Sequence, residues 1–124
     1  MTILEAVHRI DAVKPNSYTQ SEKIKWLSSL DGIIKKEIID TYEGGENIKF
    51  EGYGDKTDLN TTLLVSAPYD DVYIRWLEAR IDYANGEFGK YNNSAAAFNT
   101  AYTKFAKYYA QKHMPIHTVK RFIF

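Results

Sequence analysis

A repeat of aromatic and alanine side chains in the last third of the chain constrains the fold more than any other sequence feature. Its members are three or four residues apart, so they fall on one side of an α-helix, which turns once in about 3.6 residues. This spacing predicts a long helix from Phe88 or Tyr91 to His113, ended by Met114-Pro115 because proline does not continue a helix. The repeat consists of Tyr91, Ala95, Phe98, Tyr102, Phe105 and Tyr109.

Apolar residues recur at helical spacing in two segments of the first half as well. In the first segment, Thr2 and Glu5 have the form of a capping box, and Lys14-Pro15 ends the helix. A second helix is predicted to begin after Thr19 and to stop at Gly44-Gly45. Its apolar stripe is Trp26, Leu27, Leu30, Ile33, Ile34 and Ile38.

A further helix is predicted in the middle of the chain. Pro68 and Asp70 are typical of a helix start, and Asn85-Gly86 is typical of a helix stop. We therefore expect a mainly α fold, a bundle of three to four helices. The inner face predicted for this helix is Val72, Tyr73, Trp76, Leu77, Arg80, Ile81 and Ala84.

Residues 46–68 do not share the helical spacing. Ile48, Phe50 and Tyr53 are interleaved with polar residues, and Thr61–Val65 is apolar and β-branched, so both stretches predict strands. We expect a long loop that carries a small β hairpin. This hairpin should lean on the helices or on a partner, because two strands alone are marginally stable.

The C-terminal residues 113–124 alternate apolar and polar side chains, which predicts an extended segment. The whole chain, residues 1–124, is expected to form one domain, since this length suits a single core. It contains no cysteine, which excludes disulfides and cysteine-based zinc sites. No secretory signal pattern opens it, and no apolar run approaches the roughly 20 residues that span a bilayer. We expect an intracellular protein without a membrane partner.

The formal net charge is zero, but the charges are divided unevenly along the chain. All 16 acidic residues lie within residues 1–87 together with 10 of the 16 Lys and Arg, so that part carries −6 and residues 88–124 carry +6. The last helix can neutralise this difference by lying on the acidic part of the same fold. Alternatively, the basic end of one subunit meets the acidic flank of the next. The sequence leaves both arrangements open.

Few residue patterns resemble catalytic or metal sites. His113 and His117 have the spacing of metal ligands on a helix, but Pro115 between them breaks that helix. Glu78 and Asp82 resemble a pair of acid–base carboxylates, yet arginines nearby favour ordinary ion pairs along a helix face. We therefore predict no catalytic, cofactor-binding or metal-binding residues and no cofactor.

The aromatic residues suit either a core or a protein interface. Lysines and aromatics alternate in the last helix, but the aromatics have core spacing and the chain is not basic overall, so we expect no specific nucleic-acid partner. The chain has 10 tyrosines, whose rings are buried easily while their hydroxyls contact water or polar groups. Tyr69, Tyr83 and Tyr108 are the candidates for a second, exposed stripe.

Most of the chain resembles a known family. The stretches that carry the resemblance are AVHRIDAVKPNSYTQSEKIKWLSSLDGII, TTLLVSAPYDD and YDDVYIRWLEARIDYANGEFGKYNNSAAAFNTAYTKFAKYY. They are similar to the small, mostly helical head–tail connector proteins (adaptor or head-completion proteins) of tailed bacteriophages and of prophages in Gram-positive bacteria. The likeness rests on the order of helices and loop and on the Tyr-Asp-Asp helix start, not on a catalytic signature.

The resemblance implies a non-enzymatic virion component. Such connectors form a ring, commonly of twelve copies, between the portal protein and the tail or a stopper protein. They are located at the head–tail junction of the virion, and in the cytoplasm of the host bacterium before assembly. The candidate residues for contacts with another subunit or the portal are Ile48, Phe50, Tyr53, Tyr69, Tyr83, Tyr108, Lys120, Arg121, Phe122, Ile123 and Phe124.

Two other functions are compatible with the residues. One is a phage or host regulatory protein that binds DNA or a protein partner through its basic last helix. The other, less favoured, is a small enzyme that uses Glu78, Asp82 or the histidines. Sequence-preferring duplex binding would favour the first of these, and turnover lost on changing Glu78 to Gln would favour the second.

Overall fold

The protein is mainly α-helical, as the apolar spacing predicts. The structure is a computed structural model, and it describes residues 1–116. Within these residues no strand occurs, and β-pairing is limited to the isolated bridges Thr2–Thr62 and Tyr42–Pro115. The elements in chain order are α1 (Ile3–Val13), α2 (Gln20–Glu37), the 3-10 turns η1 (Ile39–Thr41) and η2 (Gly45–Asn47), α3 (Asp71–Ala84) and α4 (Phe88–Lys112).

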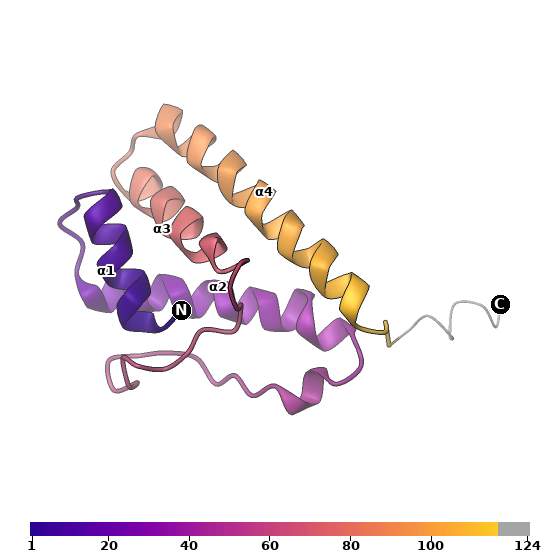
Figure 1. Cartoon of the computed structure of the whole chain (residues 1–124). Helices are drawn as coiled ribbons and strands as arrows, with labels where there is room; N and C mark the ends of the chain where they lie inside the picture. The colour runs from indigo at the N-terminus through magenta and orange to yellow at the C-terminus, as the bar shows by residue number, and fades with distance from the viewer. Residues whose placement is uncertain (117–124) are drawn as a thin grey trace.

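Helix α3 lies at the centre of the bundle. It contacts α1 on one side, α4 on the other, and α2, which crosses beneath both (Figure 1). Helices α3 and α4 run antiparallel after the turn at Asn85-Gly86, where Gly86 has a left-handed φ of 74°. Because three helices surround α3, it is buried on more sides than one amphipathic stripe would give. Its buried residues are Val72, Tyr73, Ile74, Leu77, Ala79, Ile81 and Asp82.

The predicted helix starts are confirmed in detail at the N-terminal end. The Thr2 hydroxyl accepts from the Glu5 amide at 3.1 Å, and the Glu5 carboxylate accepts from the Thr2 amide at 2.9 Å, which completes the capping box. The Thr19 hydroxyl caps α2 by accepting from the Glu22 amide at 3.1 Å. Local sequence therefore determines both starts.

The predicted end of the second helix is wrong by about two turns. α2 stops at Glu37, and the chain continues through η1 and η2 instead of remaining helical up to Gly44. Gly44 has φ of 87°, a left-handed conformation that favours glycine. Gly45 is buried, and a Cβ there would lie 2.4 Å from the carbonyl oxygen of Ile39. The turn is therefore tightly folded back on the end of α2.

The predicted β hairpin is wrong, because its backbone donors bond to other parts of the fold. The Tyr53 amide donates to Ser28 Oγ at 2.9 Å, and the Leu64 amide donates to Asp31 Oδ2 at 3.1 Å. The Val65 amide donates to the Tyr73 hydroxyl at 2.7 Å. With these amides satisfied by helix side chains, the loop follows the helices as an irregular segment and needs no strand partner.

The start of the predicted extended C-terminal segment lies beside the turn that follows α2. The Glu43 amide donates to the Met114 carbonyl at 2.8 Å, and the Ile116 amide donates to the Thr41 carbonyl at 3.1 Å. Pro115 forms the antiparallel bridge with Tyr42. The rest of the predicted segment lies outside the described residues, and with it the interface candidates Lys120, Arg121, Phe122, Ile123 and Phe124.

Candidate interaction surfaces

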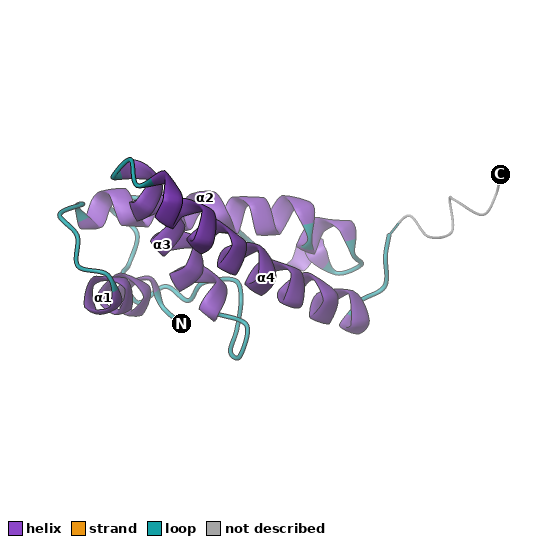
Figure 2. Ribbon diagram, turned by 90° about the horizontal axis from the view of Figure 1, so that it is seen from above, coloured by secondary structure: helices purple, strands orange, loops and turns teal. Residues whose placement is uncertain are grey.

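Helix α4 is the longest helix and the least buried. It has 25 residues, of which only Phe105 and Tyr109 are buried. The other residues of its predicted stripe, including Phe98 and Tyr102, are half-buried against α3 and the end of α2. Figure 2 looks down on α4, which lies across the outside of the bundle. One side of this helix therefore packs on the core, and the opposite side has no neighbour among the described residues.

The outer side of α4 carries a basic face, which we define as Thr100, Thr103, Lys104 and Lys107. These four side chains are exposed, and neither lysine has an ion-pair partner within 4.0 Å among residues 1–116. Two surface hollows of about 380 and 390 Å³ adjoin there, and both include Thr100 and Lys104 in their walls. The first hollow extends to Tyr69 and Arg75 at the start of α3.

An acidic turn, residues 39–48, follows α2. It contains Asp40, Glu43 and Glu46 and no Lys or Arg. Asp40 is paired with Lys35, whose ammonium also donates to the Gly45 carbonyl at 3.0 Å. Glu43 and Glu46 are exposed, and their carboxylates have no ion-pair partner within residues 1–116. The turn thus presents two free carboxylates on a backbone that is held in place.

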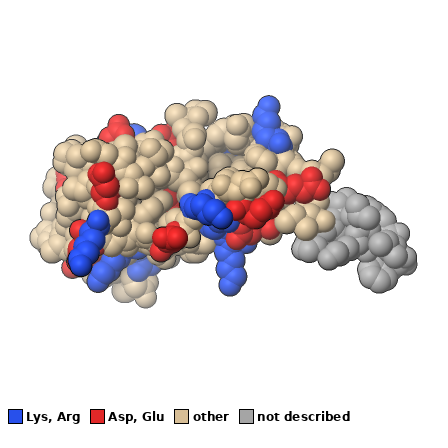
Figure 3. Space-filling model, turned by 90° about the horizontal axis from the view of Figure 1, so that it is seen from below, with Lys and Arg blue, Asp and Glu red and all other residues tan. Residues whose placement is uncertain are grey.

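A single ion pair joins the acidic and basic parts of the chain in the described residues. Six of the seven ion pairs there lie within residues 1–87. The remaining pair joins Lys90 to Glu87 at 2.7 Å, within one helical turn. Figure 3 shows acidic and basic side chains interspersed on the lower face of the molecule. Lys104, Lys107 and Lys112 of α4 are therefore left without an ion-pair partner in the described residues.

The three tyrosines predicted as an exposed stripe lie in two separate clusters, and only Tyr83 and Tyr108 are exposed, because Tyr69 is half-buried against the core. Tyr69 stacks on Tyr108 with ring centroids 4.5 Å apart, near the start of α3. At the other end of α3, Tyr83 contacts Phe88 and Tyr91 at 5.9 and 5.3 Å. Tyr83 is 51% exposed and Phe88 is 60% exposed. Phe88, which the sequence analysis named only as a possible start of the last helix, was not among the predicted interface residues.

The three interface candidates in the loop pack partly on the core. Phe50 and Tyr53 contact edge to face at 5.2 Å, and Ile48 and Tyr53 are half-buried against core residues. The Tyr53 hydroxyl donates to Asp31 at 2.5 Å, so this side chain is held by an internal contact. The hollow beside them, about 380 Å³, is lined by Phe50, Tyr53 and neighbouring loop residues.

Asp31, which the sequence did not single out, organises this loop from within. It is completely buried on α2 and accepts from the Tyr53 hydroxyl, from the Tyr73 hydroxyl at 2.6 Å, and from the Leu64 amide. Burial raises the pKa of Asp31 above its usual value, against the opposing effect of these three hydrogen bonds. Burial and the neighbouring carboxylate also raise the pKa of both tyrosines, so their hydroxyls stay protonated and donate. No local pattern marks such a residue, because its partners are distant in sequence.

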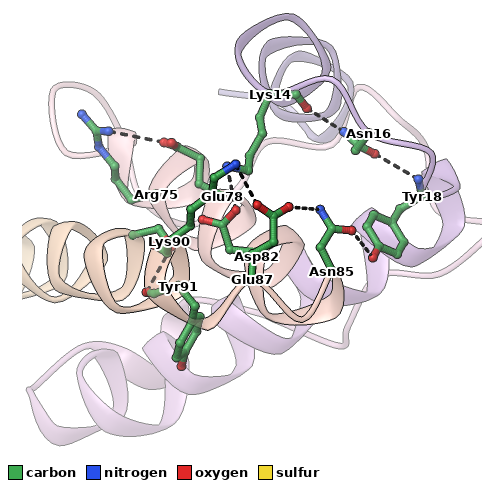
Figure 4. Close-up of polar contacts among 11 residues, drawn as sticks. Lys14, Asn16, Tyr18, Arg75, Glu78, Asp82, Asn85, Glu87, Lys90 and Tyr91 are labelled. Carbon is green, nitrogen blue, oxygen red and sulfur yellow. Dashed lines mark hydrogen bonds and ion pairs between the residues drawn. The ribbon is translucent and has the colours of Figure 1, made fainter.

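The carboxylates that resembled an acid–base pair have separate partners. Glu78 pairs with Arg75 at 3.3 Å, as the predicted ion pairing required, while the buried Asp82 lies 2.7 Å from the Lys14 ammonium (Figure 4). This contact is an ion pair, and Asp82 Oδ1 has no other polar partner in the described residues. Arg80 makes no ion pair in the described residues; its guanidinium lies 5.7 and 5.5 Å from the rings of Trp76 and Tyr83.

The remaining polar groups at this end of the molecule are hydrogen-bonded to one another. Asn85 accepts from the Tyr18 hydroxyl at 2.6 Å and donates to Glu87 at 3.4 Å (Figure 4).

At the far end of α4, His113 stacks on Tyr109 at 3.7 Å. His117, its partner in the metal-ligand spacing, lies outside the described residues, and no group of three or more potential metal ligands is found in residues 1–116.

Comparisons with known proteins add no family. Of the helices in the described part of the chain, none combines the length and the apolar character needed to cross a membrane. No family model matches the chain, and no curated protein or solved structure is significantly similar to it.

Proposed function

We propose that this chain is a non-enzymatic structural protein of a tailed bacteriophage or prophage, a connector that forms a ring between the portal and the tail. One observation carries the proposal: the longest helix, α4, buries only Phe105 and Tyr109 of its 25 residues and leaves its basic face uncovered. The unpaired lysines on this exposed face are available to an acidic surface of another protein. The sequence resemblance to head–tail connectors supplies the class of that protein.

The charges are compatible with a ring of identical copies. A contact between two different surfaces of the same molecule is heterologous, and it closes into a ring when the rotation per subunit fits. The uncovered basic face on α4 and the free carboxylates of the acidic turn are two such surfaces. The partners in this proposal are further copies of the chain, the portal protein, and a tail or stopper protein. The site of action is the head–tail junction of the virion.

One observation favours a second candidate function. Lys104 and Lys107 have no ion-pair partner among the described residues, as expected for a regulator that binds DNA or a protein through α4. The few unpaired lysines of α4 give a small electrostatic footprint, however, and the chain as a whole has no net charge. The connector therefore remains the better supported proposal.

The test is co-expression of the full chain with the portal protein encoded beside it. The connector proposal predicts portal, capsid and tail genes in its neighbourhood and a complex that purifies as a ring on the portal, visible by electron microscopy. Deleting Phe122 to Phe124 should abolish that assembly and leave the helical circular dichroism unchanged. A chain that ignores the portal but binds duplex DNA with steep salt dependence would overturn the proposal in favour of the regulator.

A further inference from the structure

We infer that the acidic turn of one copy docks on the basic face of α4 in the next copy, with Glu43 and Glu46 against Lys104 and Lys107. This inference rests on the proposed function, because it names the surfaces through which neighbouring subunits of the ring would touch. It commits to a second copy of this chain as the occupant of the α4 surface.

Charge complementarity is the first argument. Helix α4 holds four lysines and no acid, whereas residues 37–48 hold four acids and no Lys or Arg. Within one copy, two of these acids are already engaged: Glu37 accepts from the Tyr102 hydroxyl at 2.9 Å, and Asp40 pairs with Lys35. Glu43 and Glu46 remain free, as do Lys104 and Lys107, in the described residues. Lys112, the last residue of α4, has no ion-pair partner in the described residues either, so three unpaired lysines of α4 are available to two unpaired carboxylates.

No ion pair joins the two surfaces within the described residues of a single copy. In Figure 1, α4 runs diagonally downward, its C-terminal end lies beside the turn that follows α2, and η2 lies at the lower edge. The residues of α4 that face inward are Phe105 and Tyr109, and Lys104 and Lys107 lie on the exposed side of the same helix. Because these charges are unpaired in the described residues of one copy, a second copy can pair them, and such a contact would repeat from head to tail.

The acidic turn is ordered before it binds. Its backbone is tied to α2 by the Lys35 ammonium at the Gly45 carbonyl, and to the start of the C-terminal segment by the Glu43 amide at the Met114 carbonyl. Gly45 is packed so closely on Ile39 that no side chain fits there. A segment already held in one conformation loses less entropy on binding, which favours a specific contact over a diffuse one.

The receiving surface has room for side chains. The two adjoining hollows, about 380 and 390 Å³, share Lys104, and Lys107 lines the second. Carboxylates entering from a neighbouring copy would meet ammonium groups beside the threonine hydroxyls of Thr100 and Thr103. Arg75 at the far wall is already paired with Asp71 and Glu78, so the free positive charge is concentrated at the two lysines.

The absence of cysteine from the chain allows a direct proximity test. A full-length double variant, Glu46→Cys with Thr103→Cys, is oxidised at low salt and run on a denaturing gel. The inference predicts a ladder of disulfide-linked oligomers, because each copy carries both halves of the contact. High salt should make the ladder fainter, since it screens the charges that bring the copies together. The control replaces Glu46→Cys with Lys25→Cys, an exposed position on α2 that lies outside both surfaces. Equal ladders in the two variants, or none in the first, would overturn the inference.

Charge exchange tests the same contact without a crosslink. One chain carries Lys104→Glu/Lys107→Glu and another carries Glu43→Lys/Glu46→Lys, and each is assembled with the portal present. Each variant alone should need on the order of a hundredfold higher concentration to assemble, since like charges then face each other. An equal mixture should recover assembly, because alternating copies restore opposite charges at every contact. A mixture that needs as high a concentration to assemble as each variant alone would contradict the inference.

The control for charge exchange is Lys25→Glu/Lys36→Glu, which makes the same change in net charge on the exposed side of α2 and should assemble normally. The outcomes separate the inference from the proposed function. Rings on the portal formed by Lys104→Glu/Lys107→Glu would refute this contact and leave the connector in place. A disulfide ladder from a chain that never joins the portal would support the contact and refute the connector.

Discussion

Residues 1–84 and helix α4 differ in how many of their side chains are buried. Of the 20 buried hydrophobic residues in the described part of the chain, 18 precede α4. The buried polar residues Lys23, Asp31 and Asp82 are in that first part too. Helix α4 adds Phe105 and Tyr109 to this core and exposes most of its remaining surface. The comparison indicates that residues 1–84 supply most of the buried core and that α4 is mostly exposed.

The loop that precedes α3 and helix α4 also differ in the interactions that attach them to the core. The loop of residues 48–68 is fixed by hydrogen bonds to buried groups, of which the Asp31 carboxylate is the centre. Helix α4 is attached mainly by aromatic contacts, such as Trp76–Phe98 at 5.1 Å and Tyr42–Tyr109 at 5.4 Å. Aromatic packing on one side leaves the other side of a helix free to vary in composition. The division between core and exposed surface therefore runs along α4 itself.

The largest expected effect comes from cutting the attachment of α4 to the core. Phe105→Ala removes a ring that is 5% exposed, and we expect it to lower the free energy of unfolding by about 4 kcal/mol. Phe88→Ala is the matched control on the same helix, since its ring is 60% exposed, and we expect a change within about 0.5 kcal/mol. Urea unfolding followed by circular dichroism measures both. Similar losses in the two variants would show that α4 has no division into core and surface.

The second prediction concerns the polar interior. Asp31→Ala leaves the Tyr73 hydroxyl and the Leu64 amide without their acceptor inside the protein, and we expect a loss of about 3 kcal/mol in the free energy of unfolding. Glu46→Ala is the control, because this exposed acid has no ion-pair partner in the described residues and should change stability by less than about 0.5 kcal/mol. Hydrogen exchange of the Leu64 and Val65 amides should accelerate in Asp31→Ala. Unchanged exchange there would contradict the anchoring role.

The third prediction concerns the acidic turn. Gly45→Ala places a Cβ 2.4 Å from the Ile39 carbonyl oxygen, which forces the turn to shift at a cost of about 2 kcal/mol. Gly89→Ala near the start of α4 is the control, because nothing lies within 4 Å of the new Cβ and alanine favours a helix. Thermal unfolding compares the two. If Gly45→Ala is as stable as the control, the turn accommodates a side chain at position 45 more easily than its close packing on Ile39 indicates.

The sequence predicted the helices well because the information that specifies them is local. The capping box at Thr2 and the stop before Pro15 need only neighbouring residues, and both are present in the structure. The hairpin prediction was wrong because the amides of Leu64 and Val65 bond to side chains of α2 and α3, which no strand pattern reveals. For the candidate interaction surfaces, the sequence predicted which kinds of residue take part but not how they are grouped in space. Spacing indicated exposed tyrosines and a charge division, but not that Tyr69 and Tyr83 belong to separate clusters.

The smallest expected effect is the pH dependence that Asp31 contributes. Its pKa in the folded protein lies above the ordinary value of 3.8, because burial disfavours the charged form. A raised pKa means that the folded state binds the proton more tightly than the unfolded chain does. The stability that this group contributes is therefore fully present below the unfolded pKa and is lost as the pH rises through the folded pKa.

Comparison with Asp31→Asn isolates this contribution from the other acids. The pKa values of Glu5, Asp11 and Glu87 are lowered by their hydrogen bonds, so these groups lose stabilising interactions in acid in both proteins. We expect the stability of the wild type relative to Asp31→Asn to increase as the pH falls from neutral toward about 4. Urea unfolding of both proteins across this range measures the difference. A difference that shrinks in acid would mean that the three hydrogen bonds to Asp31 outweigh its burial, and the interior of the first region would then favour a charged carboxylate.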